Sequence, residues 1–378
     1  MTSANLDIAF NDEQAMIMAS AREFCRDQSN ITAVRSLLTS NLGHDPAVWS
    51  EICKLGWMGI TIPDHFGGSG FGLGALIAIV ENMGRYMLTP PLISTTLAAQ
   101  ALLRGGSDTQ KNQWLPAIAK GCCATLALLE NEDWGADIKL SAIDAGDKIT
   151  LQGVKKFVAD AQAAEFFIVS ARYRDQLMLV LVEANRLPAG AITENILIDQ
   201  TKRASTVNFS GVTVPVTACL NHIATTFRDI KLIGALLHAA EATGCCATSL
   251  DTIVSYLTTR SQFGRLIGSY QALKHPTVDI LMQMDSARSL IYHAATLIDG
   301  DSFSIDSEIA CRMAKVQADE ALLFAGDRAV QFHGAMGFTF DCDAQLYLRR
   351  AQWCQHQYGD AQHHRKHLAP LLLDATHE

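Results

Sequence analysis

One glutamate stands in apolar surroundings that suit proton transfer. Glu241 lies within residues 239–244, Ala-Ala-Glu-Ala-Thr-Gly, in the middle of a predicted helix. A carboxyl group buried among apolar side chains has its pKa raised towards that of a useful general base. The sequence therefore predicts Glu241 as a candidate catalytic base, and the alternative is a packed or paired structural glutamate.

A second carboxylate lies near the C-terminus among several basic side chains. Asp360 stands in residues 357–365, Gln-Tyr-Gly-Asp-Ala-Gln-His-His-Arg. The histidines beside it and Arg365 can neutralise a negatively charged substrate or lie in solvent. Asp360 is the second candidate for the base, and an exposed loop aspartate is the alternative.

The helical period of apolar residues places Glu241 in a long C-terminal helical region, residues 226–378. Several long helices of similar length, joined by short connections, are typical of a helix bundle. Four helices are expected, at residues 230–260, 270–299, 307–333 and 343–357.

Two other patterns precede this bundle. Residues 1–121 show mainly three- and four-residue apolar spacing, broken by a glycine-rich loop at 61–71, and Ser107 supplies capping chemistry for one helix start. Residues 122–225 show short alternating runs separated by turn residues, which predict a small antiparallel sheet domain. Strands are expected at residues 124–129, 148–151, 166–170, 178–182 and 206–209.

Composition and charge exclude several classes of protein. Hydrophobic residues make up 49% and charged residues 18% of the chain, a balance that predicts a globular protein of two or three domains. The net charge of -9 comes without a basic tract, so no nucleic-acid partner is expected. No signal-like start or membrane span is expected, which favours a soluble cytoplasmic protein. The ten cysteines show no C-x-x-C spacing, so we expect reduced thiols and no metal site.

The order of helical domain, small sheet domain and four-helix bundle resembles the acyl-CoA dehydrogenase family, and local motifs support the resemblance over nearly the whole chain. The resemblance implies an α+β multidomain fold with an N-terminal helical domain, a small antiparallel β domain and a C-terminal four-helix bundle. It also implies FAD as the cofactor and an acyl-CoA as the substrate. The matching stretches are residues 55–70, 81–85, 114–121, 260–275, 313–315, 331–338 and 346–351.

Two of these stretches resemble the segments with which family members contact FAD. In residues 260–275 the resemblance assigns Arg260, Gln262, Phe263 and Gln271 to the cofactor of a neighbouring subunit. A guanidinium suits a diphosphate, and an aromatic ring can pack beside adenine or ribose. The second stretch resembles the family's other diphosphate and adenine contact, in which glycines let the backbone approach phosphate oxygens. Its expected contact residues are Gln331, Gly334 and Gly337.

The chain departs from the family where the flavin ring and the base are expected. Leu129 replaces a threonine at the strand end that faces the flavin, and Phe157 and Ala159 replace a tryptophan and a threonine or serine on the next strand. Tyr358 or Gly359 stands where many members carry the catalytic glutamate. Gly234 stands near the position of the glutamate of a second subgroup.

The resemblance implies a subunit of a FAD-dependent acyl-CoA dehydrogenase. Its reaction converts an acyl-CoA, expected here to be bulky, to the trans-2-enoyl-CoA by removal of the alpha proton and transfer of the beta hydride to flavin. The expected acceptor is an electron-transferring flavoprotein.

In the family that this chain resembles, the retained motifs contact a partner's cofactor, whereas the lost ones serve the chain's own flavin ring and base. The alternative is therefore a catalytically silent partner that lends FAD contacts to a sister chain. A homo- or heterotetramer is expected, the latter as in similar bacterial steroid side-chain-degrading proteins. An acyl-CoA oxidase or a hydroxylating flavoprotein of the same fold is a third alternative.

Overall fold

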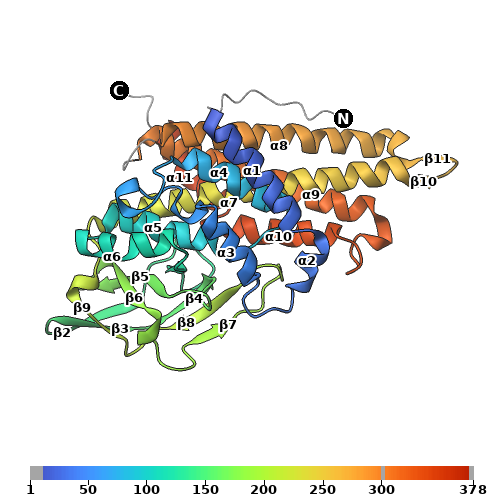
Figure 1. The fold of residues 1–378 in the computed structure, drawn as a ribbon. Coiled ribbons are helices and arrows are strands. Elements are labelled where there is room, and N and C mark those ends of the chain that lie inside the picture. The colour runs from blue at the N-terminus through green and yellow to red at the C-terminus, as the bar shows by residue number, and fades with distance from the viewer. Residues whose placement is uncertain (1–11, 299–302, 374–378) are drawn as a thin grey trace.

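The computed structural model describes residues 12–298 and 303–373, and its N-terminal helices pack between a strand-rich region and a long helical bundle (Figure 1). The predicted cap is confirmed: the Ser107 hydroxyl accepts from the Gln110 backbone N–H, and the Gln110 side chain accepts in return from the Ser107 N–H. The helices of this part are α1 (Asp12–Gln28), α2 (Ile31–Ser36), α3 (Pro46–Lys54), α4 (Leu73–Arg85), α5 (Leu92–Gly105) and α6 (Asp108–Ala119).

The predicted sheet domain is confirmed, and its strands form two sheets. The larger sheet has the order β1-β5-β2-β3-β9 with β6 paired to β5, and the smaller has the order β4-β8-β7. The expectation of a purely antiparallel domain is wrong, because β1 pairs with β5 in parallel, with Ala124 opposite Phe166. The long connection between these two strands leaves room for the crossover that parallel pairing requires. The strands are β1 (Ala124–Ala127), β2 (Ser141–Ala145), β3 (Lys148–Gln152), β4 (Val154–Ala159), β5 (Phe166–Tyr173), β6 (Gln176–Glu183), β7 (Ile192–Glu194), β8 (Ala204–Asn208) and β9 (Thr213–Pro215).

The four predicted bundle helices are confirmed, and a further helix follows them. The short strands β10 (Ser261–Gln262) and β11 (Arg265–Leu266) form a hairpin between α7 and α8, at one tip of the bundle (Figure 1). The additional helix, α11, packs on α9 near the C-terminus. The bundle helices are α7 (Ile223–Thr259), α8 (Gln271–Leu297), α9 (Ile305–Phe332), α10 (Ala344–His356) and α11 (Ala361–Leu373).

Helices α4 and α7 cross with their backbones in direct contact. A Cβ atom on Gly84 would lie 2.1 Å from the Glu241 carbonyl oxygen, and one on Gly244 would lie 1.8 Å from the Glu81 carbonyl oxygen. Only glycine permits such an approach at both positions. This crossing joins the N-terminal helices to the bundle and fixes the position of Glu241 on α7.

Helix α7 is the most apolar long helix in the part of the chain that the structure describes. By length and composition alone it could cross a membrane, but 94% of its most apolar window is buried inside the protein. Its apolar residues therefore serve as the core of the bundle, in contact with α4, α8, α9 and α10.

Candidate functional site

A small pocket lies where the strand region meets α5 and the C-terminal end of α10. Three residues predicted to face a flavin ring line it together: Leu129, just after β1, and Phe157 and Ala159 of β4. Trp353 and Tyr358 contribute to the bundle side of the pocket. The structure thus brings these predicted residues into one wall, although they come from two strands.

The backbone of β4 is distorted beside this pocket. Phe157 and Asp160 have φ values of 53° and 52°, in the left-handed region that side-chain-bearing residues rarely adopt. The pairing of β4 with β8 also shifts register between Lys155 and Val158. Such a bulge turns side chains away from the regular alternation of a strand, and here it sets Phe157, Ala159 and Asp160 along the same pocket.

The two positions at which the resemblance places a catalytic glutamate are filled by residues that pack against each other. A Cβ on Gly234 would lie 2.6 Å from the Tyr358 ring, so the glycine makes room for that ring. Tyr358 is buried and stacks on Trp134, with ring centroids 4.5 Å apart. The His238 ring lies 5.4 Å from the Tyr358 ring on the other side. An aromatic cluster therefore occupies the place expected for the base.

Glu241 does not have the raised pKa that the sequence predicted. It is buried in α7 as expected, but its Oε1 accepts hydrogen bonds from Lys202 Nζ at 2.5 Å and Arg350 Nη1 at 2.7 Å. Burial alone would raise the pKa of Glu241, but these two cations outweigh it and lower the pKa to about 2. The expectation that Glu241 has a raised pKa is therefore wrong. Its contacts agree with the alternative, a paired structural glutamate.

Asp360 also lies outside the pocket. Its side chain is exposed and accepts from the His363 backbone N–H at 2.7 Å, at the start of α11. It therefore occupies a helix-capping position. The neighbouring His364 is buried beside Arg312, so the expectation that it lies in solvent is wrong.

The cofactor contacts predicted in residues 260–275 are exposed at the hairpin tip. Arg260 follows the last residue of α7, Gln262 and Phe263 lie in the hairpin, and Gln271 begins α8. Phe263 is 92% exposed, which is unusual for so large an apolar side chain. No carboxylate in the described part of the chain forms an ion pair with Arg260. An exposed aromatic ring and a guanidinium group that has no salt-bridge partner among the described residues are thus both free to contact another molecule at this tip.

The second predicted contact begins with Gln331 in the last turn of α9 and continues past the end of that helix. Gln331 is exposed, and Gly334 has a φ of 62° that favours glycine. A Cβ on Gly337 would lie 2.1 Å from the Val330 carbonyl oxygen. Gly337 is thus required by a close approach within its own loop, whether or not a phosphate approaches it as well.

These two segments lie together at one end of the bundle. The Tyr256 ring of α7 stacks on the His333 ring at the end of α9, with centroids 4.2 Å apart. The hairpin β10–β11 projects at this end, away from the two sheets (Figure 1). The predicted cofactor-contact residues therefore form two separate groups, one at the bundle tip and one around the pocket.

Several polar residues of the pocket were missed by sequence reasoning. Ser94 Oγ donates to Asp160 at 2.6 Å in the pocket wall, and desolvation there raises the pKa of Asp160. Burial lowers the pKa of His238 to about 4, so this ring is neutral near pH 7. Asp160 could have been predicted as a pocket residue, because it directly follows Ala159, which was expected to face a flavin. Lys202 carries no such signal, because its partner Glu241 is distant in sequence.

The pocket does not fit the flavin ring that the resemblance implies. Its free volume is about 50 Å³, enough for a few water molecules. As the sequence predicted, the side chains of Leu129 and Ala159 have no group that can donate a hydrogen bond to a flavin. The Asp160 carboxyl and the Lys202–Glu241 ion pair line or border the same space.

Comparisons with known proteins match the chain from its N-terminal helices to α11. The acyl-CoA dehydrogenase N-terminal domain matches residues 11–122, and the acyl-CoA dehydrogenase C-terminal domain matches residues 232–373. The acyl-CoA dehydrogenase IpdE2 of Mycolicibacterium smegmatis is 29% identical over 345 residues, which cover 90% of this chain and 93% of that protein. The mitochondrial short/branched chain specific acyl-CoA dehydrogenase of Bos taurus is 26% identical over 361 residues, which cover 91% and 82%.

Solved structures show the same fold. A variant of the Tcur3481–Tcur3483 steroid ACAD superposes with a TM-score of 0.87 at 26% identity, covering 97% of this chain and 99% of that one. A chain of the ChsE4–ChsE5 complex from Mycobacterium tuberculosis superposes with a TM-score of 0.88 at 22% identity, with the same coverage. Two family models that together span most of the sequence, and a fold shared over nearly its whole length, show that this chain belongs to the acyl-CoA dehydrogenase family.

Proposed function

We propose that this chain is a subunit of an oligomeric, FAD-dependent acyl-CoA dehydrogenase that oxidises a bulky acyl-CoA to its trans-2-enoyl-CoA. The observation that carries this proposal is the bundle tip, where Arg260, Phe263 and the loop from Gln331 gather in solvent. An arginine and an exposed aromatic ring suit the diphosphate and adenine of a dinucleotide held by a neighbouring subunit. The proposed location is the cytoplasm, and the proposed electron acceptor is an electron-transferring flavoprotein.

The proposal of a bulky substrate is supported by relatives rather than by the pocket of this chain. One solved relative is described as a steroid ACAD, and the ChsE4–ChsE5 complex contains two different chains. A substrate of steroid size and an assembly with a second, related chain are therefore the first alternatives to examine.

A second candidate function is a catalytically silent subunit, and a specific observation favours it. Gly234 and Tyr358 fill both positions expected for the base, and neither can take up a proton from carbon near neutral pH. Burial raises the pKa of Tyr358, which keeps its hydroxyl neutral. In such an assembly the chain's contribution to catalysis is to hold the cofactor of its partner and to stabilise the oligomer.

The test is to purify this chain, through a tag, from the cells that make it, together with any chain bound to it. We expect a yellow complex that contains FAD and is bleached anaerobically by a steroid-side-chain acyl-CoA. Arg260→Ala should lower the FAD content several-fold, whereas Arg22→Ala, which removes an exposed charge on α1, should leave it unchanged. A complex without flavin, or equal FAD content in both variants, would contradict the proposed function.

A further inference from the structure

We infer that this chain closes its own flavin cavity with internal contacts and holds no flavin there, so that any flavin of the assembly lies in a partner's cavity. The inference rests on the proposed function and specifies which cavity the cofactor uses. It is carried by three sets of contacts around the pocket: an ion-pair network, an arginine clamp and the aromatic cluster of Trp134, Tyr358 and His238.

The ion-pair network joins three elements behind the pocket. Glu241 of α7 binds Lys202 of the β7–β8 connection and Arg350 of α10, and Arg350 Nε also donates to Asp199 at 2.5 Å. Thr201 Oγ1 accepts from Arg350 Nη2 at 2.5 Å. The side chains of Glu241, Arg350 and Asp199 are at most 1% exposed. Removing one partner of a buried ion pair leaves an uncompensated charge, so this network resists opening.

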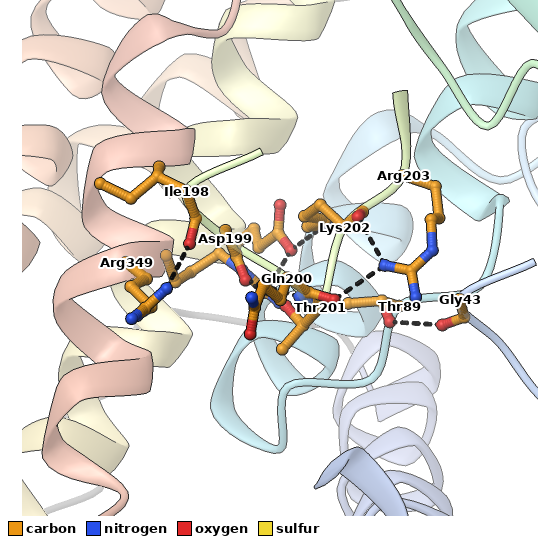
Figure 2. A network of polar contacts seen from close by, with 11 residues as sticks. Gly43, Thr89, Ile198, Asp199, Gln200, Thr201, Lys202, Arg203 and Arg349 are labelled. Carbon is orange, nitrogen blue, oxygen red and sulfur yellow. Dashed lines mark hydrogen bonds and ion pairs between the residues drawn. The ribbon is translucent and has the colours of Figure 1, made fainter. Parts of the chain in front are cut away.

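Lys202 connects this network to the pocket itself. Its residue lines the pocket together with Thr201 and Arg203, while its Nζ lies 2.5 Å from Glu241. Figure 2 shows the lysine directed back into the network from the loop that borders the pocket. The Lys202 ammonium group is therefore engaged by Glu241 and is not offered to a ring in this space.

The Arg203 guanidinium prevents the loop itself from moving aside. It donates to the carbonyl oxygens of Leu37, Leu38 and Ser40 in the N-terminal part, at 2.5–3.0 Å. It also donates to the carbonyl oxygens of Gln200 and Lys202 in its own loop, at 2.7 and 2.8 Å (Figure 2). Charge-assisted hydrogen bonds of this number hold residues 200–203 against two parts of the molecule at once.

The aromatic cluster closes the bundle side. Tyr358 is held between Trp134 and α7, and the Trp134 indole N–H donates to the His356 carbonyl oxygen at 2.7 Å. The Tyr358 ring packs closely on α7, because a Cβ on Gly234 would lie 2.6 Å from it. The Arg203 contacts and the aromatic cluster thus hold opposite sides of the pocket in place.

Stoichiometry and cavity variants test this inference in the purified assembly. We expect no FAD in a homo-oligomer of this chain alone, and in a complex with a related chain we expect FAD equimolar with that chain. Ala159→Phe, which fills the pocket, and Leu129→Ala, which enlarges it, should both leave the FAD content unchanged, whereas Arg260→Ala should lower it several-fold.

The outcomes separate the two proposals. One FAD per copy of this chain when it is purified alone, or a several-fold loss of FAD in Ala159→Phe, would overturn the closed cavity while leaving the dehydrogenase function intact. Should Ala159→Phe not fold, retention of full FAD content by Leu129→Ala together with the stoichiometry still decides the matter. Absence of flavin from every assembly would instead overturn the proposed function.

Discussion

Glu241 shows how the charge of neighbouring side chains decides what a buried carboxylate can do. In an apolar environment it would titrate near neutral pH, but two cations within 2.7 Å keep it ionised. An ionised carboxylate with a pKa of about 2 is a poor proton acceptor. We therefore expect Glu241 to contribute to stability rather than to catalysis.

Glu241→Gln should lower the free energy of unfolding by about 3 kcal/mol at pH 7, because Lys202 and Arg350 would lose their shared counter-charge. The folded-state pKa of about 2 lies below the ordinary value of 4.5. The carboxylate's contribution is therefore fully present above about pH 4.5 and is lost as the pH falls towards 2. Urea unfolding at pH 7, 5 and 3 should show the difference between wild type and variant shrinking only below pH 4.5.

The matched control for this experiment is Glu320→Gln, which removes an ion pair with Arg365 on the surface. Both side chains of that pair are about half exposed. Such a pair contributes about 0.5 kcal/mol or less. Equal losses of unfolding free energy in the two variants would show that the Glu241 network stabilises the protein no more than a surface ion pair does.

At the scale of elements, the crossing of α4 and α7 depends on two glycines rather than on side-chain packing. Gly244→Ala would place a methyl group against the Glu81 carbonyl oxygen, which no side-chain rotation can relieve. The helices must then separate, and we expect a loss of about 3 kcal/mol despite the better helix propensity of alanine. The measurement is the urea midpoint, compared with Ser255→Ala on the exposed face of α7. A change of less than about 0.5 kcal/mol in Gly244→Ala would contradict this close approach.

The helices could be predicted from the sequence because their apolar period and caps are local signals. Ser107 caps α6 as predicted, and α7 to α10 lie close to the expected ranges, except that α7 begins at Ile223 rather than at residue 230. α11 was missed: no helix was expected beyond residue 357, and an exposed loop was the alternative considered for Asp360. The parallel pairing of β1 with β5 was missed because strand partners are chosen by tertiary packing.

The candidate site was predictable only in part for a similar reason. Phe157 and Ala159 reach the pocket as expected from neighbouring positions on one strand. The role of Glu241 depends on Lys202 and Arg350, which come from other elements. The residues next to Glu241 in the sequence give no sign of these two partners. The burial of Glu241 was therefore predicted correctly, but its pairing with two cations was not.

At the scale of the whole molecule, the bundle tip carries an apolar surface that a monomer would leave in water. Phe263, Met336, Phe338 and Phe340 are each more than half exposed, and they lie on the hairpin and on the segment that follows α9. Large exposed apolar side chains of this kind are typical of a protein interface.

Phe263→Asp should weaken subunit association about tenfold or more, since it places a charge where an apolar contact is expected. Sedimentation equilibrium of the purified assembly measures this change. Ile196→Asp is the control, because Ile196 is also fully exposed but lies in the β7–β8 connection, away from the tip. Association of the Phe263 variant at wild-type strength would exclude the tip from the interface.

The glycine crossing of α4 and α7 also has a consequence for synthesis on the ribosome. Gly84 is translated about 160 residues before Gly244, so the face of α4 that packs on α7 has no partner until the strand region and most of α7 have been made. At about 5–20 residues per second this delay is roughly 10–30 s. During that time the N-terminal helices cannot complete their packing, and the emerging chain presents an apolar helix of the kind that molecular chaperones bind. We expect the yield of folded protein to depend on chaperones during translation more than the stability of the finished molecule suggests.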